Sequence, residues 1–305
     1  MNILAELNLP SPVTQIKTPL LSEKKIKLFI KRDELIHPVV QGNKWRKLKY
    51  NLIEAQKTNT KTLLSFGGAY SNHLHALAYA GNQLGIKTIG IIRGEAPQVL
   101  NPCLQDMKNW GMQLKFIKRI DYKKKNNDEY INYLKKQLGD FYLIPEGANN
   151  ALGKKGCAEI LEELQEPYDT ICCEVGSGTM LSSLIQHNNT PHTQYLGFAV
   201  MKNPQLDDDI SNSSKIMQGS TIQLPTWKIN HAYHFGGFAK TTDELNHFIK
   251  TFKQQHNIQL EPVYSGKMFW GIFDLISKDQ FKPGTKILAI HGGGLQGLRG
   301  YKYFS

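Results

Sequence analysis

Short apolar segments alternate with helix-length segments along most of this chain, and this alternation limits the possible folds more than any other feature. In the first half the pattern predicts strands at residues 62–66, 87–92, 113–118 and 142–144, and helices at 72–84, 98–110 and 129–137. Strands joined through helices run parallel, and the helices cover both faces of the sheet. The chain is therefore predicted to have an α/β fold built on parallel sheets.

The alternation resumes after residue 150. The predicted elements there are helix 152–164, strand 170–175, a helix ending at 186, strand 195–201, helices 242–255 and 266–277, and strand 286–290. One further strand is predicted near the N-terminus, at 26–31. A proline-rich lead-in precedes them, and the polar residues 203–237 predict no regular element or role. With 305 residues and no repeat or linker, we expect two closely packed α/β domains.

The distribution of charge along the chain argues against nucleic-acid binding. The net charge of +11 comes from 37 basic and 26 acidic residues, which are spread along the chain apart from residues 123–125 and the segment around residue 44. No stripe of basic and aromatic residues accompanies them, so the spread is typical of a solvated surface. A positive field would favour anionic or phosphorylated ligands.

The cysteines and the apolar runs indicate the compartment. Cys103, Cys157, Cys172 and Cys173 show no C-x-x-C spacing, and the adjacent pair would point to opposite faces of a strand. We therefore expect neither a metal site nor a disulfide framework. No run approaches the ~18 apolar residues that a membrane span needs, and the N-terminus lacks an apolar signal region. A cytoplasmic protein without a membrane partner is predicted.

One lysine is placed unusually. Gly42-Asn43 reads as a turn, and apolar residues follow it at helical spacing: Trp45, Leu48, Leu52 and Ala55. Lys44 then lies in the first turn of a helix and at the edge of its apolar face. The helix dipole and partial burial both lower the pKa of an amine there. An amine of lowered pKa is more often neutral, so Lys44 could act as a nucleophile that forms a Schiff base with a carbonyl carbon. The alternative is a lysine extended along the surface of a basic helix.

Gly176-Ser177-Gly178-Thr179 lies between a predicted strand and a predicted helix. Its backbone N–H groups, two hydroxyls and the helix N-terminus would converge on one point, as in a phosphate site. The segment lacks the lysine of a Walker loop and is too short for the dinucleotide pattern. An ordinary glycine turn is the alternative.

Three other junctions carry polar or glycine-rich residues. Residues 67–73 follow a strand, and Ser71 or Asn72 would cap the next helix in the ordinary interpretation. His73 and His75 fall on different faces of that helix, so they do not form a metal pair. Residues 291–294 end the last strand, and residues 264–267 open an apolar helix, with an exposed Lys267 as the ordinary interpretation.

Together these features suit one cofactor. Pyridoxal phosphate needs a lysine amine for its aldehyde, an anion site for its phosphate, a hydrogen bond at its ring hydroxyl and a polar partner at its ring nitrogen. Lys44 and the four junctions together supply these groups. We therefore predict pyridoxal 5'-phosphate as the cofactor and a small-molecule amino acid as the substrate.

The same stretches resemble the pyridoxal-phosphate enzymes that include 1-aminocyclopropane-1-carboxylate deaminase and D-cysteine desulfhydrase. The matching segments are KRDEL (31–35), GNKWRKL (42–48), FGGAYSNH (66–73), IPEGANNALGKKG (144–156), VGSGT (175–179), PVYSGK (262–267) and HGGGLQG (291–297). The resemblance implies two parallel-sheet α/β domains of the tryptophan-synthase-β kind. Residues 1–46 plus 151–305 would form the large cofactor-binding domain, and 47–150 the small domain.

The resemblance also implies roles for individual residues. Lys44 would bond the cofactor, Ser71 would receive the substrate carboxylate and Tyr264 would face the substrate. The other implied contacts are Asn72 at the ring hydroxyl, Gly176, Ser177, Gly178 and Thr179 at the phosphate, Ser265 at the pyridine nitrogen, and His73 and Phe238 at the substrate.

Three positions depart from the family pattern. Deaminases of the family carry a glutamate where this chain has Ser265, and a leucine or threonine usually follows the histidine where this chain has Gly292. The second active-site tyrosine of the family matches Phe238 here, with Tyr233 as the other candidate. These departures leave the cofactor prediction intact and bear on the substrate.

The resulting hypothesis is a lyase that eliminates sulfide from D-cysteine or a related β-substituted D-amino acid, with released Lys44 as the base. The preference for a D-amino acid comes from the resemblance alone. The alternatives are 1-aminocyclopropane-1-carboxylate deaminase and a pyridoxal-phosphate-binding protein without turnover. We also expect a homodimer.

Overall fold

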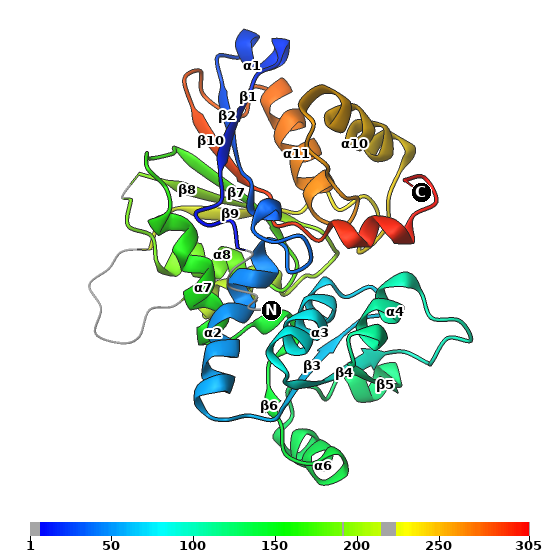
Figure 1. The fold of residues 1–305 in the computed structure, drawn as a ribbon. Coiled ribbons are helices and arrows are strands. Elements are labelled where there is room, and N and C mark those ends of the chain that lie inside the picture. The colour runs from blue at the N-terminus through cyan, green and yellow to red at the C-terminus, as the bar shows by residue number, and fades with distance from the viewer. Residues whose placement is uncertain (1–6, 191, 215–223, 305) are drawn as a thin grey trace.

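The computed structural model describes residues 7–190, 192–214 and 224–304, and its ten strands form two sheets (Figure 1). The larger sheet has the order β1-β2-β10-β7-β8-β9. All neighbours in it are parallel except β1 and β2. Its strands are β1 (Val13–Ile16), β2 (Lys27–Lys31), β7 (Thr170–Val175), β8 (Gln194–Ala199), β9 (Trp227–Asn230) and β10 (Lys286–Ile290).

The smaller sheet has the order β5-β4-β3-β6 and is parallel throughout. Its strands are β3 (Thr62–Gly67), β4 (Lys87–Arg93), β5 (Gln113–Ile117) and β6 (Tyr142–Leu143). The predicted α/β fold with parallel sheets is confirmed. The division of the chain at residues 46 and 150 stays a prediction.

Helices cover both faces of the larger sheet. Side chains of α10 (Asp243–His256) and α11 (Ser265–Ser277) pack on one face, and those of α7 (Ala151–Glu162) and α8 (Thr179–Gln186) on the other. The adjacent cysteines of β7 separate these faces, because Cys172 joins the first cluster and Cys173 the second. The prediction that they point to opposite faces is confirmed.

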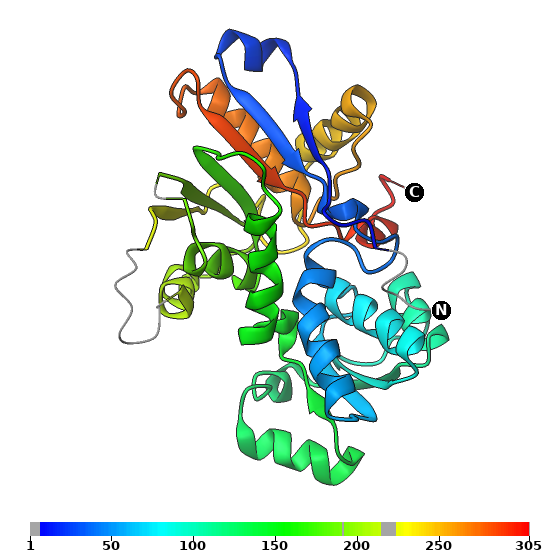
Figure 2. The same cartoon turned by 60° about the vertical axis from the view of Figure 1, so that its left-hand side comes forward.

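The smaller sheet is covered in the same way. Apolar side chains of α2 (Asn43–Lys57), α3 (Asn72–Leu84) and α4 (Pro102–Asn109) form one cluster with it. Short α5 (Arg119–Tyr122) and α6 (Asp128–Leu138) supply the other face. Figure 2 shows α2 (blue) beside α7 (green), where the two sheet-and-helix units meet.

Some elements differ from the predicted ones. The lead-in contains β1 and α1 (Pro19–Glu23), and the region 203–237 contains α9 (Leu206–Ser214) and β9; its residues 215–223 lie outside the described residues. Helix α4 begins at Pro102 rather than at residue 98, because the Asn101 side chain accepts the Leu104 N–H and proline suits a first helical position. Short β-strands and capped turns give weaker periodic signals than long helices.

A buried ionic network fixes the start of α2. Arg46 is fully buried, and its guanidinium binds both oxygens of Asp33 at 2.6 and 2.8 Å. It also binds both oxygens of Glu163, the C-cap residue of α7, at 2.9 Å, and Lys31 donates to Glu163 at 2.6 Å. Gly156 lets α7 approach, since a Cβ there would lie 1.8 Å from the Arg46 carbonyl oxygen. This network holds the helix that carries Lys44.

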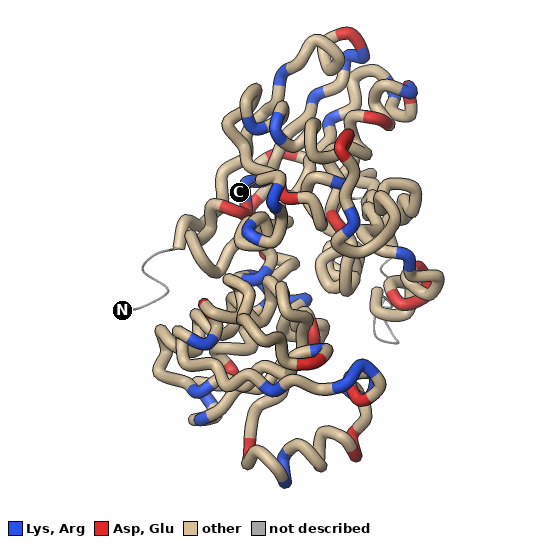
Figure 3. Tube along the Cα trace, turned by 90° about the vertical axis from the view of Figure 1, so that its right-hand side faces the viewer, with Lys and Arg blue, Asp and Glu red and all other residues tan. Residues whose placement is uncertain are grey.

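Basic and acidic residues are interspersed over both units, as Figure 3 shows. No helix among the described residues combines the length and the apolar character needed to cross a membrane.

Candidate active site

Lys44 is the second residue of α2, as the sequence predicts. Its Nζ lies 3.5 Å from the carbonyl oxygen of Gly292 and 5.5 Å from the centroid of the Tyr264 ring. Burial lowers the pKa of Lys44, and repulsion from Lys47 lowers it further. The predicted direction of the pKa is confirmed, and burial is its main cause. A lowered pKa increases the fraction of neutral, nucleophilic amine.

The turn before Lys44 docks on the glycine-rich segment that follows β10. Gly42 has a φ of +55°, and a Cβ on it would lie 2.3 Å from the Gly292 carbonyl oxygen. The side-chain oxygen of Gln41 accepts the N–H groups of Gly294 and Leu295, each at 3.0 Å. Only glycine allows this approach, which brings residues about 250 positions apart in the sequence together.

The Tyr264 ring connects Lys44 with the glycine turn after β7. A Cβ on Gly176 would lie 3.2 Å from Cε1 of this ring, so the absence of a side chain there leaves room for it. Burial raises the pKa of the Tyr264 phenol, and the nearby carboxylates of Glu261 and Glu174 raise it further. The phenol is therefore a protonated donor at neutral pH.

Phe238, and not Tyr233, is the second aromatic residue beside Tyr264. The rings of Phe238 and Tyr264 meet edge to face with 6.0 Å between centroids, and Phe238 is 45% exposed. Tyr233 lies in the core and donates to Asp274 at 2.7 Å. The first of the two predicted candidates therefore has the position that could face a substrate.

The predicted phosphate cradle has the expected backbone. Helix α8 begins at Thr179, and Gly178 before it adopts a left-handed φ of +78°. The hydroxyls of Ser177 and Thr179 lie 2.9 Å apart. Gly147 makes room for Ser177, because a Cβ there would lie 2.9 Å from Oγ of Ser177. Free N–H groups at a helix start together with paired hydroxyls favour an anion.

The start of α3 brings two predicted residues beside the glycine-rich segment. Ser71 caps the helix, and its Oγ accepts the Leu74 N–H at 3.2 Å. The Asn72 side chain accepts a short hydrogen bond from Gln296, and a Cβ on Gly294 would lie 2.4 Å from Nδ2 of Asn72. Ser71 and Asn72 therefore stand at a helix N-terminus that borders the residues around Lys44.

The His73 side chain contacts another buried residue of the protein. It is buried, and its Nε2 lies 2.8 Å from Oγ of Ser65 on β3. Burial lowers its pKa to about 3, and the positive charges of Lys47 and Lys44 contribute. The ring is neutral at physiological pH. Its contact with Ser65 does not favour the predicted contact with a substrate.

Ser265 is fully buried and borders a second buried group, the Glu261 carboxylate. Its Oγ accepts the Glu261 N–H at 3.0 Å and lies 3.3 Å from Oε1 of Glu261. That carboxylate accepts the N–H groups of Val263, Tyr264 and Ser265 at 2.7 to 2.8 Å. Burial raises the pKa of Glu261. Glu261 therefore shapes the turn that presents Tyr264 and Ser265.

The interpretation of Lys267 as an exposed residue is wrong. Its side chain is completely buried, and Nζ donates to the carbonyl oxygens of Val200 (3.2 Å), His234 (2.9 Å) and Gly237 (2.8 Å). Burial lowers its pKa to about 8. These bonds tie α11 to the loop that carries Phe238.

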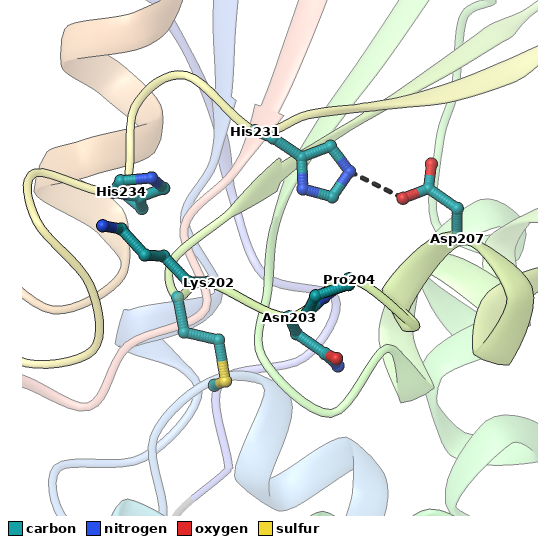
Figure 4. Close-up of a pocket in the computed structure, with 7 residues that line it drawn as sticks. Lys202, Asn203, Pro204, Asp207, His231 and His234 are labelled. Atoms are coloured by element: carbon teal, nitrogen blue, oxygen red, sulfur yellow. Dashed lines mark hydrogen bonds and ion pairs between the residues drawn. The ribbon is translucent and has the colours of Figure 1, made fainter.

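A hollow of about 330 Å³ is lined by residues 201–204, Asp207, His231 and His234. Figure 4 shows His231 turned toward Asp207, with 2.6 Å between Nε2 and Oδ2, and Lys202 beside His234. The residues that line the hollow include none of the predicted site residues. Lys44 is not among these lining residues, and Lys267 donates to the carbonyl oxygen of one of them, His234.

The sequence analysis missed Glu174, although a glutamate inside an apolar strand is an unusual signal. Glu174 lies near the end of β7 and is 5% exposed. Its Oε1 accepts a hydrogen bond from Nδ2 of Asn43 at 3.3 Å. Burial raises its pKa, and the nearby Lys44 opposes that change. A buried carboxylate therefore belongs to the surroundings of Lys44.

Comparison with known proteins places these features in a family context. The sequence matches the family described as "Pyridoxal-phosphate dependent enzyme" over residues 8–293. It is 29% identical to the "Bifunctional D-cysteine desulfhydrase/1-aminocyclopropane-1-carboxylate deaminase, mitochondrial" of Arabidopsis thaliana, over 95% of this chain and 78% of the relative.

Solved structures share the fold. The structure described as "ACC deaminase homologue" superposes with a TM-score of 0.79 at 26% identity, covering 96% of this chain and 91% of that one. The O-acetylserine dependent cystathionine beta-synthase from Helicobacter pylori gives a TM-score of 0.69 at 16% identity, covering 100% and 98%. The similarity to the Helicobacter pylori enzyme, at 16% identity, shows the fold alone.

Proposed function

Because the chain belongs to the pyridoxal-phosphate dependent enzymes, we propose that it is a lyase that eliminates sulfide from D-cysteine or a related β-substituted D-amino acid. The other products are ammonia and a 2-oxo acid. The observation that carries this choice is the buried hydroxyl of Ser265 at the position where deaminases of the family carry a glutamate.

The residues around Lys44 fit the cofactor. Lys44 supplies an amine of lowered pKa, and residues 176–179 supply an anion site at the start of α8. Within the described part of the chain, Oδ1 of Asn43 and Oε2 of Glu174 are buried without a hydrogen-bond partner. Buried polar atoms rarely lack partners, so these two atoms support a polar ligand at this place.

Each side chain has a proposed role in the reaction. When bound, pyridoxal phosphate supplies a conjugated ring that takes up the electron pair left at Cα. Neutral Lys44 accepts the Cα proton, and its lowered pKa supports that role at physiological pH. Ser71 and the free N–H groups of α3 receive the substrate carboxylate. Tyr264 and Phe238 border the substrate side chain.

Ser265 bears on the choice of substrate. A carboxylate at the pyridine nitrogen would keep it protonated, whereas a hydroxyl leaves it largely neutral and the ring a weaker electron acceptor. The nearby Glu261 carboxylate is engaged by three backbone N–H groups. Expulsion of a stable thiolate tolerates a weaker acceptor, but opening a cyclopropane ring does not.

There are two alternatives to this proposed function. The similarity to the bifunctional Arabidopsis enzyme supports 1-aminocyclopropane-1-carboxylate deaminase as the second candidate. A cofactor-binding protein without turnover is the third. The convergence of Tyr264 and Lys44 within 5.5 Å is more than cofactor storage needs, which disfavours it. The homodimer stays a prediction.

The three candidates differ in their products. Purified protein with cofactor is incubated with D-cysteine, L-cysteine and 1-aminocyclopropane-1-carboxylate, and sulfide, pyruvate and 2-oxobutanoate are measured. We expect sulfide and pyruvate from D-cysteine and little 2-oxobutanoate. Faster formation of 2-oxobutanoate would identify the deaminase, and no product from any member of a wider panel of β-substituted amino acids would favour the non-catalytic protein.

A further inference from the structure

The C-terminal segment after β10 reaches across to the helices of the smaller sheet. Residues Leu295–Gly300 form a short 3-10 helix, η4, directly after the glycine-rich turn. In Figure 1 this segment (red) lies beside α4. Two of its side chains, Gln296 and Arg299, hydrogen-bond with side chains of α3 and α4. The segment therefore contacts the helix start that carries Ser71 and Asn72.

Five side chains form a continuous series of hydrogen bonds through this contact. The Asp106 carboxylate on α4 accepts from Nε2 of His75 at 2.9 Å and from the Arg299 guanidinium at 2.5 Å. Arg299 also donates to Gln296, from Nη2 to the side-chain oxygen at 3.4 Å and from Nε to the backbone oxygen at 3.3 Å. Nε2 of Gln296 in turn donates to Oδ1 of Asn72. The series therefore ends on the Asn72 amide.

The chemistry of Arg299 fixes the direction of the bonds that lead to Asn72. A guanidinium carries donors and no acceptor, so the Gln296 side-chain atom beside it must be the oxygen. The NH₂ group of Gln296 then faces Asn72, and the Asn72 atom that meets it must be the acceptor, Oδ1. Within the described part of the chain, Nδ2 of Asn72 donates to no other residue. Asn72 is therefore left with a free donor.

This free donor lies against the glycine-rich turn. A Cβ on Gly294 would lie 2.4 Å from Nδ2 of Asn72, so a glycine is needed there to leave room for the amide. The N–H group of the same Gly294 donates to Gln41, three residues before Lys44. One short segment therefore connects the Asn72 amide with the turn that carries Lys44.

We propose that Gln296 is a positioning residue, which orients the Asn72 amide so that its NH₂ group, and not its oxygen, is available to the bound cofactor. Arg299 sets the orientation of Gln296. Asp106 and His75 in turn hold Arg299. The acceptor is the ring hydroxyl oxygen of pyridoxal phosphate, which needs a donor when it is ionised. The inference rests on the proposed function for the presence of the cofactor, but not on which substrate is turned over.

Gln296→Glu tests this orientation without changing the size of the side chain. The new carboxylate has no donor, so Asn72 would turn its NH₂ group toward position 296 and its oxygen away from it. The full-length protein with its cofactor absorbs visible light, and the band depends on whether the nitrogen that joins Lys44 to the cofactor is protonated. We expect the midpoint of its pH titration to rise by about one unit, because the ring oxygen loses a donor and holds the neighbouring proton more strongly.

A carboxylate at position 296 also adds a negative charge, so the two effects are separated in an Asn72→Ala background. There Gln296→Glu acts through its charge alone, and most of the shift should disappear. Gln105→Glu is the matched control on α4, since Gln105 is exposed and donates to the side-chain oxygen of Asn109 at 2.8 Å. It should leave the midpoint unchanged. Equal shifts with and without the Asn72 amide would overturn the proposal.

Gln296→Met covers the case in which Gln296→Glu does not fold. Its side chain is of similar length but has neither a donor nor a charge, so it leaves the Asn72 amide unheld. The midpoint should rise in the same direction by a smaller amount. A midpoint equal to that of the wild type would show that Gln296 does not orient Asn72.

Failure of the proposed function would look different. Wild-type protein without a visible band would contradict the cofactor role of Lys44, and urea unfolding of the purified protein then tests the inference. Asn72→Ala and Gln296→Ala each break the same bond, so the urea midpoint of the double variant should fall by less than the sum of the two single losses. Strictly additive losses would overturn the positioning of Asn72 by Gln296.

Discussion

The Nζ atom of Lys44 lies 5.5 Å from the centroid of the Tyr264 ring, on whose edge the glycine turn after β7 also packs. One aromatic ring therefore connects the amine with the anion site. The three stretches come from the N-terminal, central and C-terminal parts of the chain. Because the three stretches meet at one ring, the proposed role of each can be tested by a single substitution within it.

Lys44 should be the lysine that bonds the cofactor. Borohydride reduction of the purified protein followed by peptide mapping should label the peptide that contains Lys44. Lys44→Ala should lose the visible band entirely, because no other amine occupies this position. Lys47→Arg serves as the neighbouring control and should retain the band. A label on Lys47 or on any other lysine would contradict the assignment.

Ser177→Asp should weaken cofactor binding by ~100-fold or more. Two like charges about 4 Å apart repel by about 4 kcal/mol at an effective dielectric constant of about 20, and the bound phosphate is an anion. Gly178 is unsuitable for this test, since a side chain there would be strained at φ +78° and would lie 2.9 Å from Ile210. Cofactor affinity is measured by titration of apoprotein, with Ser177→Ala as the uncharged control. Equal affinities of Ser177→Asp and Ser177→Ala would exclude the phosphate from this turn.

A glutamate at position 265 should shift the product ratio toward 2-oxobutanoate. Ser265→Glu alone would place two buried carboxylates together, because Oγ of Ser265 already lies 3.3 Å from Glu261. Combining it with Glu261→Gln avoids this repulsion and keeps an acceptor for the backbone N–H groups. The rates with D-cysteine and 1-aminocyclopropane-1-carboxylate are compared in the double variant and in Glu261→Gln. Identical ratios in the two proteins would show that residue 265 does not select the substrate.

Gly292→Ala should destabilise the protein by about 1–3 kcal/mol, as overpacking of a filled core does. The added methyl group would meet the Glu174 carboxylate at 1.9 Å. In a Glu174→Ala background the same change should cost less, with a coupling of about 0.5–3 kcal/mol. Urea unfolding of the four proteins in this cycle gives the coupling. Strictly additive effects would mean that the two positions do not compete for space.

His73 should make the folded state sensitive to acid. Its pKa of about 3 in the folded protein lies below the ordinary 6.5, so its contribution is complete above pH 6.5 and is lost as the pH falls toward 3. The loss between pH 7 and pH 4.5 should be about 2–3 kcal/mol. Urea unfolding at both pH values is compared for wild type and His73→Gln, whose amide can still bond Ser65. The variant should lose less stability, and an equal loss would contradict the assignment.

Much of the fold could be read from local patterns. The helix predicted at residues 72–84 and the strands predicted at 62–66 and 87–92 match α3, β3 and β4 to within one residue, since their apolar residues must face the core. Lys44 could be assigned to the first turn of α2 for the same reason. The groups at these turns and helix starts then predicted the cofactor, and the resemblance of seven motifs predicted the family.

Other features depend on contacts between distant segments. The TICCEV strand indicates burial of Glu174, but nothing local indicates that its carboxylate accepts from Asn43 and takes the space of a side chain at residue 292. The surroundings of Ser265 also require the fold, because the Glu261 side chain must turn back onto the helix start. The ordinary interpretation of an exposed Lys267 fails for the same reason, because its carbonyl partners lie 30 to 67 residues away in the sequence.

The sequence by itself determined the parallel α/β framework, the glycine turns at its strand ends and the set of groups that suits pyridoxal phosphate. Only the tertiary structure decided which ionisable groups are buried together around Lys44, and that Phe238 rather than Tyr233 lies beside Tyr264. Backbone pattern is a local property of neighbouring residues. The pKa of a buried group, in contrast, depends on desolvation and on charges that distant segments bring within a few ångströms.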